Sequence, residues 1–334
     1  MLVQNLPVAD GPPIGDERVS DEELGSPIDE KHNEAQVSVE EDVTDADEAL
    51  GLVGMRRTAE FSEEYYKKLR RKLDLTIPPL CAAVYFTQFL DKTSLNYASI
   101  MNFPITGQHY NLVALAFYVG FFIWEFPTVY LAQKTRLAKY LGVNVVLWGV
   151  VLMLQAIPNT FAPFFVLRIL LGMLESCVAP ILILIISMFY KKNEQSRRIS
   201  WFYVMNGLTS IFGGFVAYGI SFDNTKGFAP YKILFLLLGG LAIMVGIAVL
   251  IWLPDSPVHA KNLTREERIA ALERVRDDQG GTENKTIKKA QIIEALTDIR
   301  TWLIVISTLV TSIPNGSLSN FNAIIVRVKT SLDT

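Results

Sequence analysis

Long apolar blocks separated by short polar loops are the feature that most limits what this chain can fold into. Half of its 334 residues are hydrophobic. A helix needs roughly 20 residues to cross a hydrocarbon core about 30 Å thick, and several of the blocks reach that length. The sequence therefore predicts an all-α membrane protein with seven membrane-crossing segments, at about 77–99, 110–132, 140–158, 161–188, 199–220, 230–253 and 302–326.

The first 50 residues have the opposite character. They contain fifteen Asp or Glu residues against Arg18 and Lys31, a net charge of about −13, and almost no aromatic side chains. Such a segment buries too little apolar surface to offset the entropy cost of ordering, and it has no basic start or short apolar run like that of a signal peptide. We expect a disordered acidic tail at 1–60, a six-helix bundle at 75–253, a loop at 254–300 and a seventh helix at 301–326.

Basic residues in the short loops predict the orientation of the chain, because Lys and Arg are retained on the cytoplasmic side. They are frequent just before the first segment, at 67–72, and in the loops after the second and fourth segments. The loops "NFPITGQHY" and "PNTFAP" contain none. The N-terminus and the loop at 254–300 are therefore expected in the cytoplasm, which excludes a G-protein-coupled receptor. Thr264 and Glu267 have the spacing of a capping box and predict a helix within that loop.

Five ionisable residues inside the apolar segments are the strongest functional signal. On insertion scales an ionisable side chain in the membrane costs roughly 2.5 to 3.5 kcal/mol, so it persists mainly where it pairs or faces water. The five are Asp91 and Lys92 in the first segment, Glu125 in the second, and Arg168 and Glu175 in the fourth. The alternative is that these charges only hold helices together.

Residue counts predict the depths of these charges in the membrane. Asp91 and Arg168 each lie about eight residues from the outer ends of their segments, or about 12 Å deep at 1.5 Å per residue, so an ion pair between them is available. Glu125 and Glu175 each lie about fifteen residues deep, where two acids could contest one proton. Lys92 is expected to extend outward along its aliphatic stem.

Small and polar residues share helix faces with these charges. Charge and small residues together suit a water-filled cavity or a close helix contact, and the glycines and Ser210 more often serve packing. The three faces consist of Thr87 or Gln88, Asp91, Ser94 and Ala98; of Arg168, Gly172, Glu175 and Ala179; and of Asn206, Gly207, Ser210, Gly213 and Gly214.

Several other kinds of chemistry lack support in the sequence. The three histidines, His32, His109 and His259, fall outside the apolar segments, so a His-built metal site or catalytic triad is not expected. Cys81 and Cys177 lie within apolar segments and imply no disulfide or metal framework. No phosphate-binding glycine loop is present to support an ATP-driven pump. We therefore expect no enzyme activity, no cofactor and no nucleic acid partner. A charged path through an apolar bundle is instead typical of a secondary transporter.

Six stretches of the sequence carry a family resemblance. In order from about residue 75 to 326, they resemble the fungal allantoate permease family, the anion:cation symporters of the major facilitator superfamily. The stretches are "YFTQFLDKTSLNYASIM", "WEFPTVYLAQ", "RILLGMLESCVAPILILIISMFYKKNEQSRR", "WFYVMNGL", "LPDSPVHAKNLTREER" and "TWLIVISTLVTSIPNGSLSNF". The resemblance implies twelve helices in two bundles, and proton-coupled uptake of small organic anions at the plasma membrane. The anions of that family include allantoate, ureidosuccinate, nicotinate, pantothenate and biotin.

The resemblance also implies roles for individual residues. Arg168 would bind the carboxylate of the substrate, and Asp91 would neutralise Arg168 in the empty site. Glu125 or Glu175 would carry the coupled proton. Polar lining would come from Asn206 of the fifth segment and, through the resemblance, from Asn315 and Asn320 of the seventh, while Lys134 or Arg136 would contact a gate.

The chain stops at Thr334, where the resemblance implies about five further segments. Several interpretations follow from this difference. The sequence could represent a shortened copy of a full permease, a fragment without transport, or a half-transporter that works as a dimer. A nutrient sensor built on a permease scaffold is the alternative from a different functional class. The sequence does not select among individual carboxylates as substrates.

Overall fold

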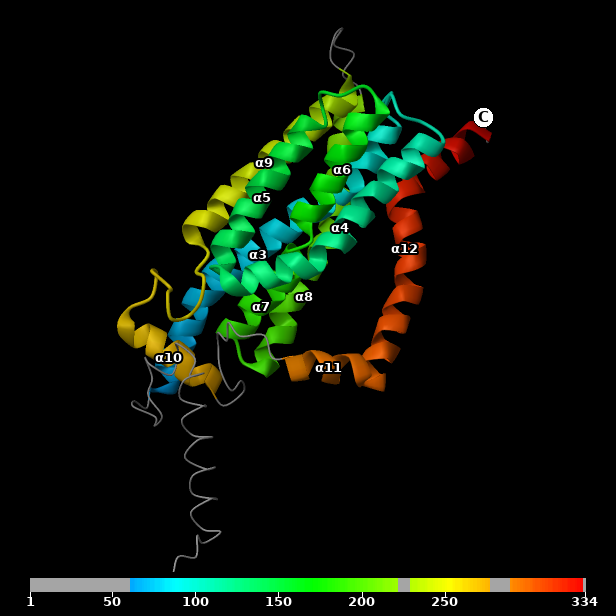
Figure 1. Ribbon diagram of the computed structural model, residues 1–334. Coiled ribbons are helices and arrows are strands. Elements are labelled where there is room, and N and C mark those ends of the chain that lie inside the picture. Colours follow the sequence, from blue (N-terminus) through cyan, green and yellow to red (C-terminus); the bar gives the residue numbers. More distant parts are fainter. Residues whose placement is uncertain (1–60, 222–228, 277–288, 333–334) are drawn as a thin grey trace, which may run out of the picture. The chain divides into compact units, whose positions relative to one another are not determined.

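The computed structural model describes residues 61–221, 229–276 and 289–332, and all regular structure in these ranges is helical (Figure 1). The acidic tail predicted at residues 1–60 lies outside them. Within the described ranges, six spans are long and apolar enough to cross a membrane. Five are single helices: α3 (Glu63–Ser99), α4 (Gln108–Lys134), α5 (Leu137–Leu154), α8 (Lys192–Ser221) and α9 (Pro230–Trp252). The sixth combines α6 (Phe161–Glu175) and α7 (Val178–Phe189).

The fourth segment, predicted at 161–188, is confirmed as a membrane-length span at Phe161–Phe189, with an interruption between α6 and α7. The interruption at Ser176 and Cys177 follows from Pro180, which has no N–H to donate to the Ser176 carbonyl and whose ring crowds that carbonyl. Regular bonding continues on both sides, from the Ser176 amide to Gly172 and from the Ile181 amide to Cys177, each at 3.2 Å. The break leaves Glu175 as the last residue of α6.

The chain after α9 forms three more helices in the described ranges: α10 (Arg265–Arg276), α11 (Lys289–Thr297) and α12 (Ile299–Leu332). The predicted capping box precedes α10, because the Thr264 amide donates to Glu267 Oε2 at 2.9 Å and the Glu267 amide donates to Thr264 Oγ1 at 3.2 Å. The seventh segment is helical as predicted, although α12 is not among the six membrane-length spans.

Glycines set how closely neighbouring helices approach. A Cβ atom added to Gly172 of α6 would lie 2.0 Å from the carbonyl oxygen of Phe117, and one on Gly120 of α4 would lie 2.2 Å from an α6 carbonyl oxygen. The same holds for α5 and α9, where a Cβ on Gly149 would lie 2.8 Å from the Gly239 carbonyl oxygen. Small residues permit such backbone contacts in membrane bundles. The packing role expected of the glycines is confirmed for Gly172 and Gly213, whereas a Cβ on Gly207 or Gly214 would meet nothing within 4 Å.

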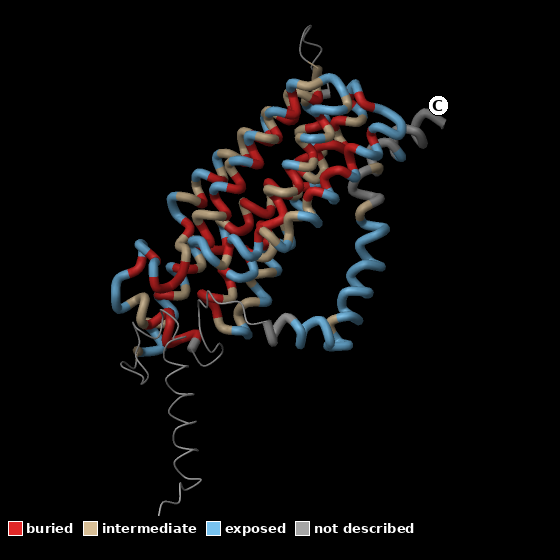
Figure 2. Tube along the Cα trace, viewed as in Figure 1, coloured by how far each residue is buried: buried red, intermediate tan, exposed pale blue. Residues whose placement is uncertain are grey.

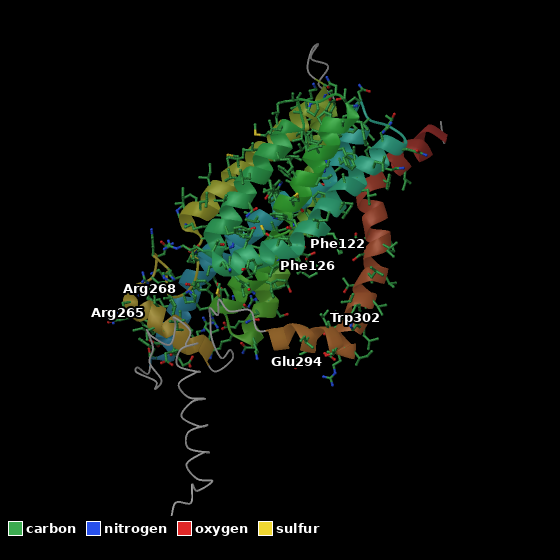
Figure 3. All side chains as sticks on the ribbon, viewed as in Figure 1. Phe122, Phe126, Arg265, Arg268, Glu294 and Trp302 are labelled. Carbon is green, nitrogen blue, oxygen red and sulfur yellow. The ribbon has the colours of Figure 1, made fainter. Side chains whose placement is uncertain are left out.

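These contacts arrange the helices into a bundle around α3. The helix α5 packs along α9, α4 along α6, and α3 against both α8 and α9. Buried residues follow the inward sides of these helices, whereas α12 is exposed along most of its described length (Figure 2). Apolar side chains also cover outer surfaces, as at Phe122 and Phe126 of α4 and Trp302 of α12 (Figure 3). Such exposed apolar surface is expected of helices that meet lipid rather than water.

Ion pairs tie α10 to the end of the bundle where α3 begins. Glu194 of α8 accepts from Arg70 of α3 at 3.1 Å and also pairs with Arg274 of α10. Lys72 of α3 donates to Glu267 of α10 at 2.7 Å. Burial raises the pKa of Glu267, but the hydrogen bonds from Lys72 and from the Thr264 amide outweigh it and hold that pKa below its ordinary value.

Substitution of Gly172 tests the contact between α4 and α6. Gly172→Ala places a methyl group against the Phe117 carbonyl, and we expect the free energy of unfolding to fall by about 1 to 3 kcal/mol. The matched control is Gly207→Ala, because a Cβ on Gly207 meets nothing within 4 Å. Thermal unfolding of the purified protein in detergent measures both. Equal melting temperatures for the two variants would contradict the contact.

Candidate functional site

Four of the five predicted membrane charges come from two helices. Asp91 and Lys92 are neighbours on α3, while Arg168 and Glu175 lie on α6. Asp91, Arg168 and Glu175 are 1%, 2% and 0% exposed. Because isolated charges in an apolar interior are strongly disfavoured, this degree of burial means that the four side chains must compensate one another.

Lys92 and Glu175 form the direct ion pair of the site. Lys92 Nζ lies 3.6 Å from Glu175 Oε1, and the Gln88 amide also interacts with this carboxylate. The Glu175 carboxylate is fully buried, and an uncompensated charge there is strongly disfavoured. Lys92 therefore supplies the main compensation for Glu175. The prediction that Lys92 extends outward was wrong.

Asp91 and Arg168 interact at longer range. Each is the strongest charged neighbour of the other, but they form no ion pair within 4 Å. Asp91 accepts a hydrogen bond from the Ser94 hydroxyl at 3.3 Å and also interacts with the indole of Trp148. The ion pair that the sequence made available is therefore not formed at ion-pair distance, and the two charges interact only at longer range.

Aromatic rings hold the guanidinium of Arg168. Its carbon lies 5.9 Å from the ring centre of Phe164 and 6.0 Å from that of Phe235 on α9. Its Nε and Nη2 atoms are buried without a hydrogen-bond partner. A buried charged donor without a partner is costly, so these two N–H groups raise the free energy of the structure as it stands.

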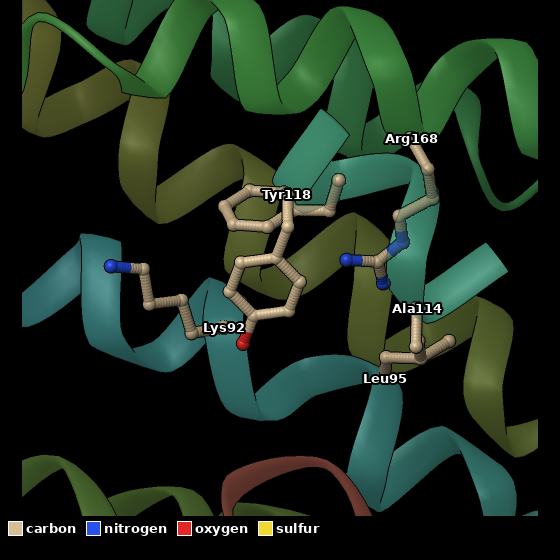
Figure 4. A pocket seen from close by; sticks show the side chains of 6 residues that line it. Lys92, Leu95, Ala114, Tyr118 and Arg168 are labelled. Carbon is tan, nitrogen blue, oxygen red and sulfur yellow. The ribbon is translucent and has the colours of Figure 1, made fainter. Parts of the chain in front are cut away.

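A small pocket joins Lys92 to Arg168. Leu95, Ala114, Phe117 and Tyr118 complete its lining. The Tyr118 ring lies between the Lys92 side chain and the Arg168 guanidinium (Figure 4). The cavity has a volume of about 10 Å³, roughly the room that one water molecule needs. Its lining combines two cations, a phenol and an apolar wall.

The other acid and the amide predicted for the site lie apart from this cluster. Glu125 of α4 is half-buried and makes no hydrogen bond or ion pair with any described residue. No described contact joins Glu125 to Glu175, so competition between the two carboxylates for one proton stays a prediction. Asn206 of α8 is half-buried near the Tyr85 hydroxyl, and its Oδ1 atom is buried without a hydrogen-bond partner.

The remaining predicted residues lie on the outer parts of the chain. Lys134, at the end of α4, is exposed and sits 4.4 Å from the ring centre of Tyr130. Arg136 is the exposed residue before α5. Asn315 is exposed on α12, and the side chain of Asn320 lies outside the described residues. The described part of the chain contains no group of three or more His, Cys, Asp or Glu residues able to hold a metal ion.

Sequence reasoning missed four contributors to the site: Lys92 as a partner of Glu175, and Trp148, Phe235 and Tyr118 as neighbours of the charges. Counting residues from the end of a segment did not reveal the Lys92–Glu175 pair. That count ignores helix tilt and side-chain length, and an extended lysine side chain is longer than one helical turn. The aromatic residues gave no signal, because a Trp or Phe in an apolar helix is indistinguishable from ordinary packing.

Six membrane-length spans and a buried charged cluster define a multi-pass integral membrane protein of the transporter class. Residues 81–328 match the sequence model of the Major Facilitator Superfamily. The chain belongs to this superfamily, whose members are transporters and not enzymes.

The curated relatives are fungal. The chain is 38% identical over 288 residues to allantoate permease of Saccharomyces cerevisiae, covering 84% of this chain and 53% of that protein. It is 38% identical over 279 residues to the uncharacterized transporter C417.10 of Schizosaccharomyces pombe, covering 82% and 55%. The predicted resemblance to allantoate permeases is confirmed. The chain spans about half the length of these relatives.

Solved structures show the same fold. A bacterial homolog of the human lysosomal transporter Spinster, in an inward-facing and unoccupied conformation, aligns with a TM-score of 0.55 at 12% sequence identity. The alignment covers 79% of this chain and 56% of that one. At this identity the likeness confirms the fold.

Removal of Lys92 tests the ion pair with Glu175. Lys92→Met leaves a fully buried carboxylate without its cation, and we expect the free energy of unfolding to fall by about 2 kcal/mol. Adding Glu175→Gln should restore most of this loss, since it removes the uncompensated charge. Thermal unfolding of both single variants and the double variant gives the coupling.

The control is Lys134→Met, which removes an exposed lysine and should change stability by less than about 0.5 kcal/mol. If the Lys92 and Glu175 effects simply add, the two side chains do not form a compensating pair.

Proposed function

We propose that this protein binds a small organic carboxylate and a proton in the pocket between α3 and α6 and carries both across the membrane by alternating access. The observation that carries the proposal is the partly compensated charge cluster of Asp91, Lys92, Arg168 and Glu175 around that pocket. Within this cluster Arg168 has two buried N–H groups without an acceptor, and a carboxylate oxygen could accept from each.

Arg168 provides the anion site. Its guanidinium presents parallel donors that match a carboxylate, and hydrogen bonds of this charged kind are about twice as strong as neutral ones. The rings of Phe164 and Phe235 lie beside it at cation–π distance. Asp91 balances the charge of Arg168 in the empty site, and an arriving carboxylate takes over that role.

Charge balance supplies a reason for proton coupling. With all four groups ionised the cluster is neutral, and a bound monoanion makes it negative. Lys92 borders the pocket and also compensates Glu175. When the substrate attracts Lys92, the Glu175 carboxylate loses its cation in a buried position, and taking up a proton removes the penalty. One anion and one proton then move together.

Several finer assignments belong to the same proposal. Glu125 is a second candidate for carrying the coupled proton. The candidates for contact with the substrate are Asn206, Asn315 and Asn320. Lys134 and Arg136 are candidates for contact with a gate. We place the N-terminus in the cytoplasm and the protein in the plasma membrane, on the basis of the basic loops and the resemblance to allantoate permeases.

The substrate class rests on the pocket and on the relatives. Two cations beside an apolar wall favour a small carboxylate. Curated relatives include an allantoate permease, a high affinity cysteine transporter and a thiamine pathway transporter of Saccharomyces cerevisiae. Allantoate and cysteine both carry a carboxylate, so ureides, amino acids and vitamin acids form the first panel of ligands.

Replacement of Arg168 tests the anion site. Arg168→Gln should abolish both binding of labelled allantoate to the purified chain and its uptake into proteoliposomes under an inward proton gradient. Arg168→Lys keeps the positive charge but lacks the planar guanidinium that can donate two parallel hydrogen bonds. This variant should bind allantoate more weakly than the native chain. The control is Arg265→Gln, on the exposed surface of α10 (Figure 3). Normal binding by Arg168→Gln would refute the assignment. Binding without uptake by the native chain would instead favour a sensor.

Replacement of the two glutamates tests proton coupling. Glu175→Gln should bind the anion with an affinity that no longer changes with pH, because the variant mimics the protonated side chain permanently. Glu125→Gln should keep the pH dependence if Glu175 alone carries the proton. Binding measured between pH 5 and 8 distinguishes the two. Full pH dependence in both variants would remove the proton role from both residues.

A further inference from the structure

The helix α3 is longer than a membrane crossing requires. It has 37 residues, about 55 Å at 1.5 Å per residue, against a hydrocarbon core of about 30 Å. Its apolar part begins at Ile77, so the turns from Glu63 to Thr76 project beyond that core. This projecting part lies at the end of the bundle where α8 begins and α10 packs.

One side of the projecting part is fully engaged with the protein. Leu69 and Leu73 are 2% and 3% exposed. The charged residues on this side have partners, because Arg70 pairs with Glu194 and Lys72 pairs with Glu267 of α10. Asp74 likewise receives a two-pronged hydrogen bond from Arg198, with both distances 2.8 Å. This side therefore has no charge left for another partner.

The other side is basic and open. Lys67, Lys68 and Arg71 are exposed, and none of them makes a hydrogen bond or ion pair with another described residue. Lys68 interacts electrostatically with Glu267, but the two side chains are farther apart than an ion pair. Leu75 completes the surface, which we call the α3 basic face, and is 79% exposed. Residues 67, 71 and 75 follow one another at four-residue steps on one side of the helix, with residue 68 beside them.

Two acidic residues lie near the α3 basic face and do not neutralise it. Glu63 and Glu64 occupy the first turn of α3, one turn before Lys67 and Lys68. Both are exposed, and neither forms an ion pair within 4 Å with a described residue. Their position at the helix N-terminus is favourable in itself, because carboxylates there oppose the positive end of the helix dipole. The three basic residues remain available.

The spacing of the α3 basic face fits the boundary of a bilayer. Leu75 lies two residues before the apolar segment, at the edge of the hydrocarbon core. Arg71 lies about 6 Å farther along the axis, and Lys68 and Lys67 about 11 and 12 Å farther. The headgroup region adds roughly 5 to 8 Å on each side of the core, and long basic side chains bend toward the level of the charge that they bind. All three cations can therefore reach lipid phosphates.

We propose that the α3 basic face, formed by Lys67, Lys68, Arg71 and Leu75, binds the headgroups of anionic phospholipids in the adjacent leaflet. Basic residues directly beside a membrane helix attract anionic lipids by about 1 kcal/mol each near the surface. The exposed Leu75 at the core boundary fits an acyl chain better than it fits water. This lipid site is separate from the anion pocket and does not depend on the proposed transport function.

Counting of bound lipid tests the site. The full chain in detergent is titrated with phosphatidylserine or phosphatidylcholine, and native mass spectrometry measures the bound fraction of each. The triple variant Lys67→Gln, Lys68→Gln, Arg71→Gln should lose its preference for phosphatidylserine by at least about tenfold. A charge-retaining variant, Lys67→Arg with Lys68→Arg, should keep that preference and shows that the fold is intact.

The matched control removes three other exposed positive charges, in Lys261→Gln, Arg265→Gln, Arg300→Gln. This variant has the same net charge as the first triple and should keep the native preference for phosphatidylserine. The proposal is overturned if both triples lose the preference equally, which would indicate a nonspecific charge effect. It is also overturned if the α3 triple binds phosphatidylserine like the native chain, or if inorganic phosphate displaces the lipid, which would indicate a site for a soluble anion.

Discussion

Burial of four ionisable side chains inside an apolar helical bundle is the constraint on which the rest of this structure depends. Asp91, Arg168 and Glu175 are almost completely removed from solvent, and each would be unstable there alone. The solution is a charge cluster shared between α3 and α6, with Lys92 reaching to Glu175 and with aromatic rings around Arg168. Close packing of α4 on α6 at Gly172 holds α6 in position for these contacts.

Two charged regions of the same chain illustrate different uses of ion pairs. Near α10, Asp74 and Arg198 form a complete fork, and Glu194 pairs with two arginines, Arg70 and Arg274. These close ion pairs join α3, α8 and α10. Inside the bundle, Lys92 and Glu175 are 3.6 Å apart and Arg168 keeps two N–H groups without acceptors. The interior charges differ from the α10 contacts in lying inside the apolar bundle, where an unpartnered charged group costs most, and this is the basis of the binding function that we propose.

The break between α6 and α7 connects local sequence to this chemistry. Pro180 removes one backbone hydrogen bond close to Glu175, while Ser176 and Cys177 keep helical backbone angles. The Glu175 carboxylate is fully buried, so its charge depends on Lys92. Likeness to a structure at 12% identity shows that the fold tolerates wide changes in sequence, because apolar surface can be buried by many side chains. The function that we propose depends instead on a few polar positions, chiefly Asp91, Lys92, Arg168 and Glu175.

The sequence by itself determined the helical membrane architecture, the superfamily and the capping box at Thr264 and Glu267, because hydrophobic length, motif order and cap spacing are local properties of the chain. It also identified Asp91, Arg168 and Glu175 as candidate functional residues, because burying an ionisable side chain in an apolar segment costs free energy. Only the tertiary structure decided that Lys92 pairs with Glu175, that Glu125 lies apart from the cluster, and that Phe235 of α9 reaches Arg168. These contacts depend on helix tilt, on the reach of long side chains and on which faces meet, and no one segment of sequence encodes them.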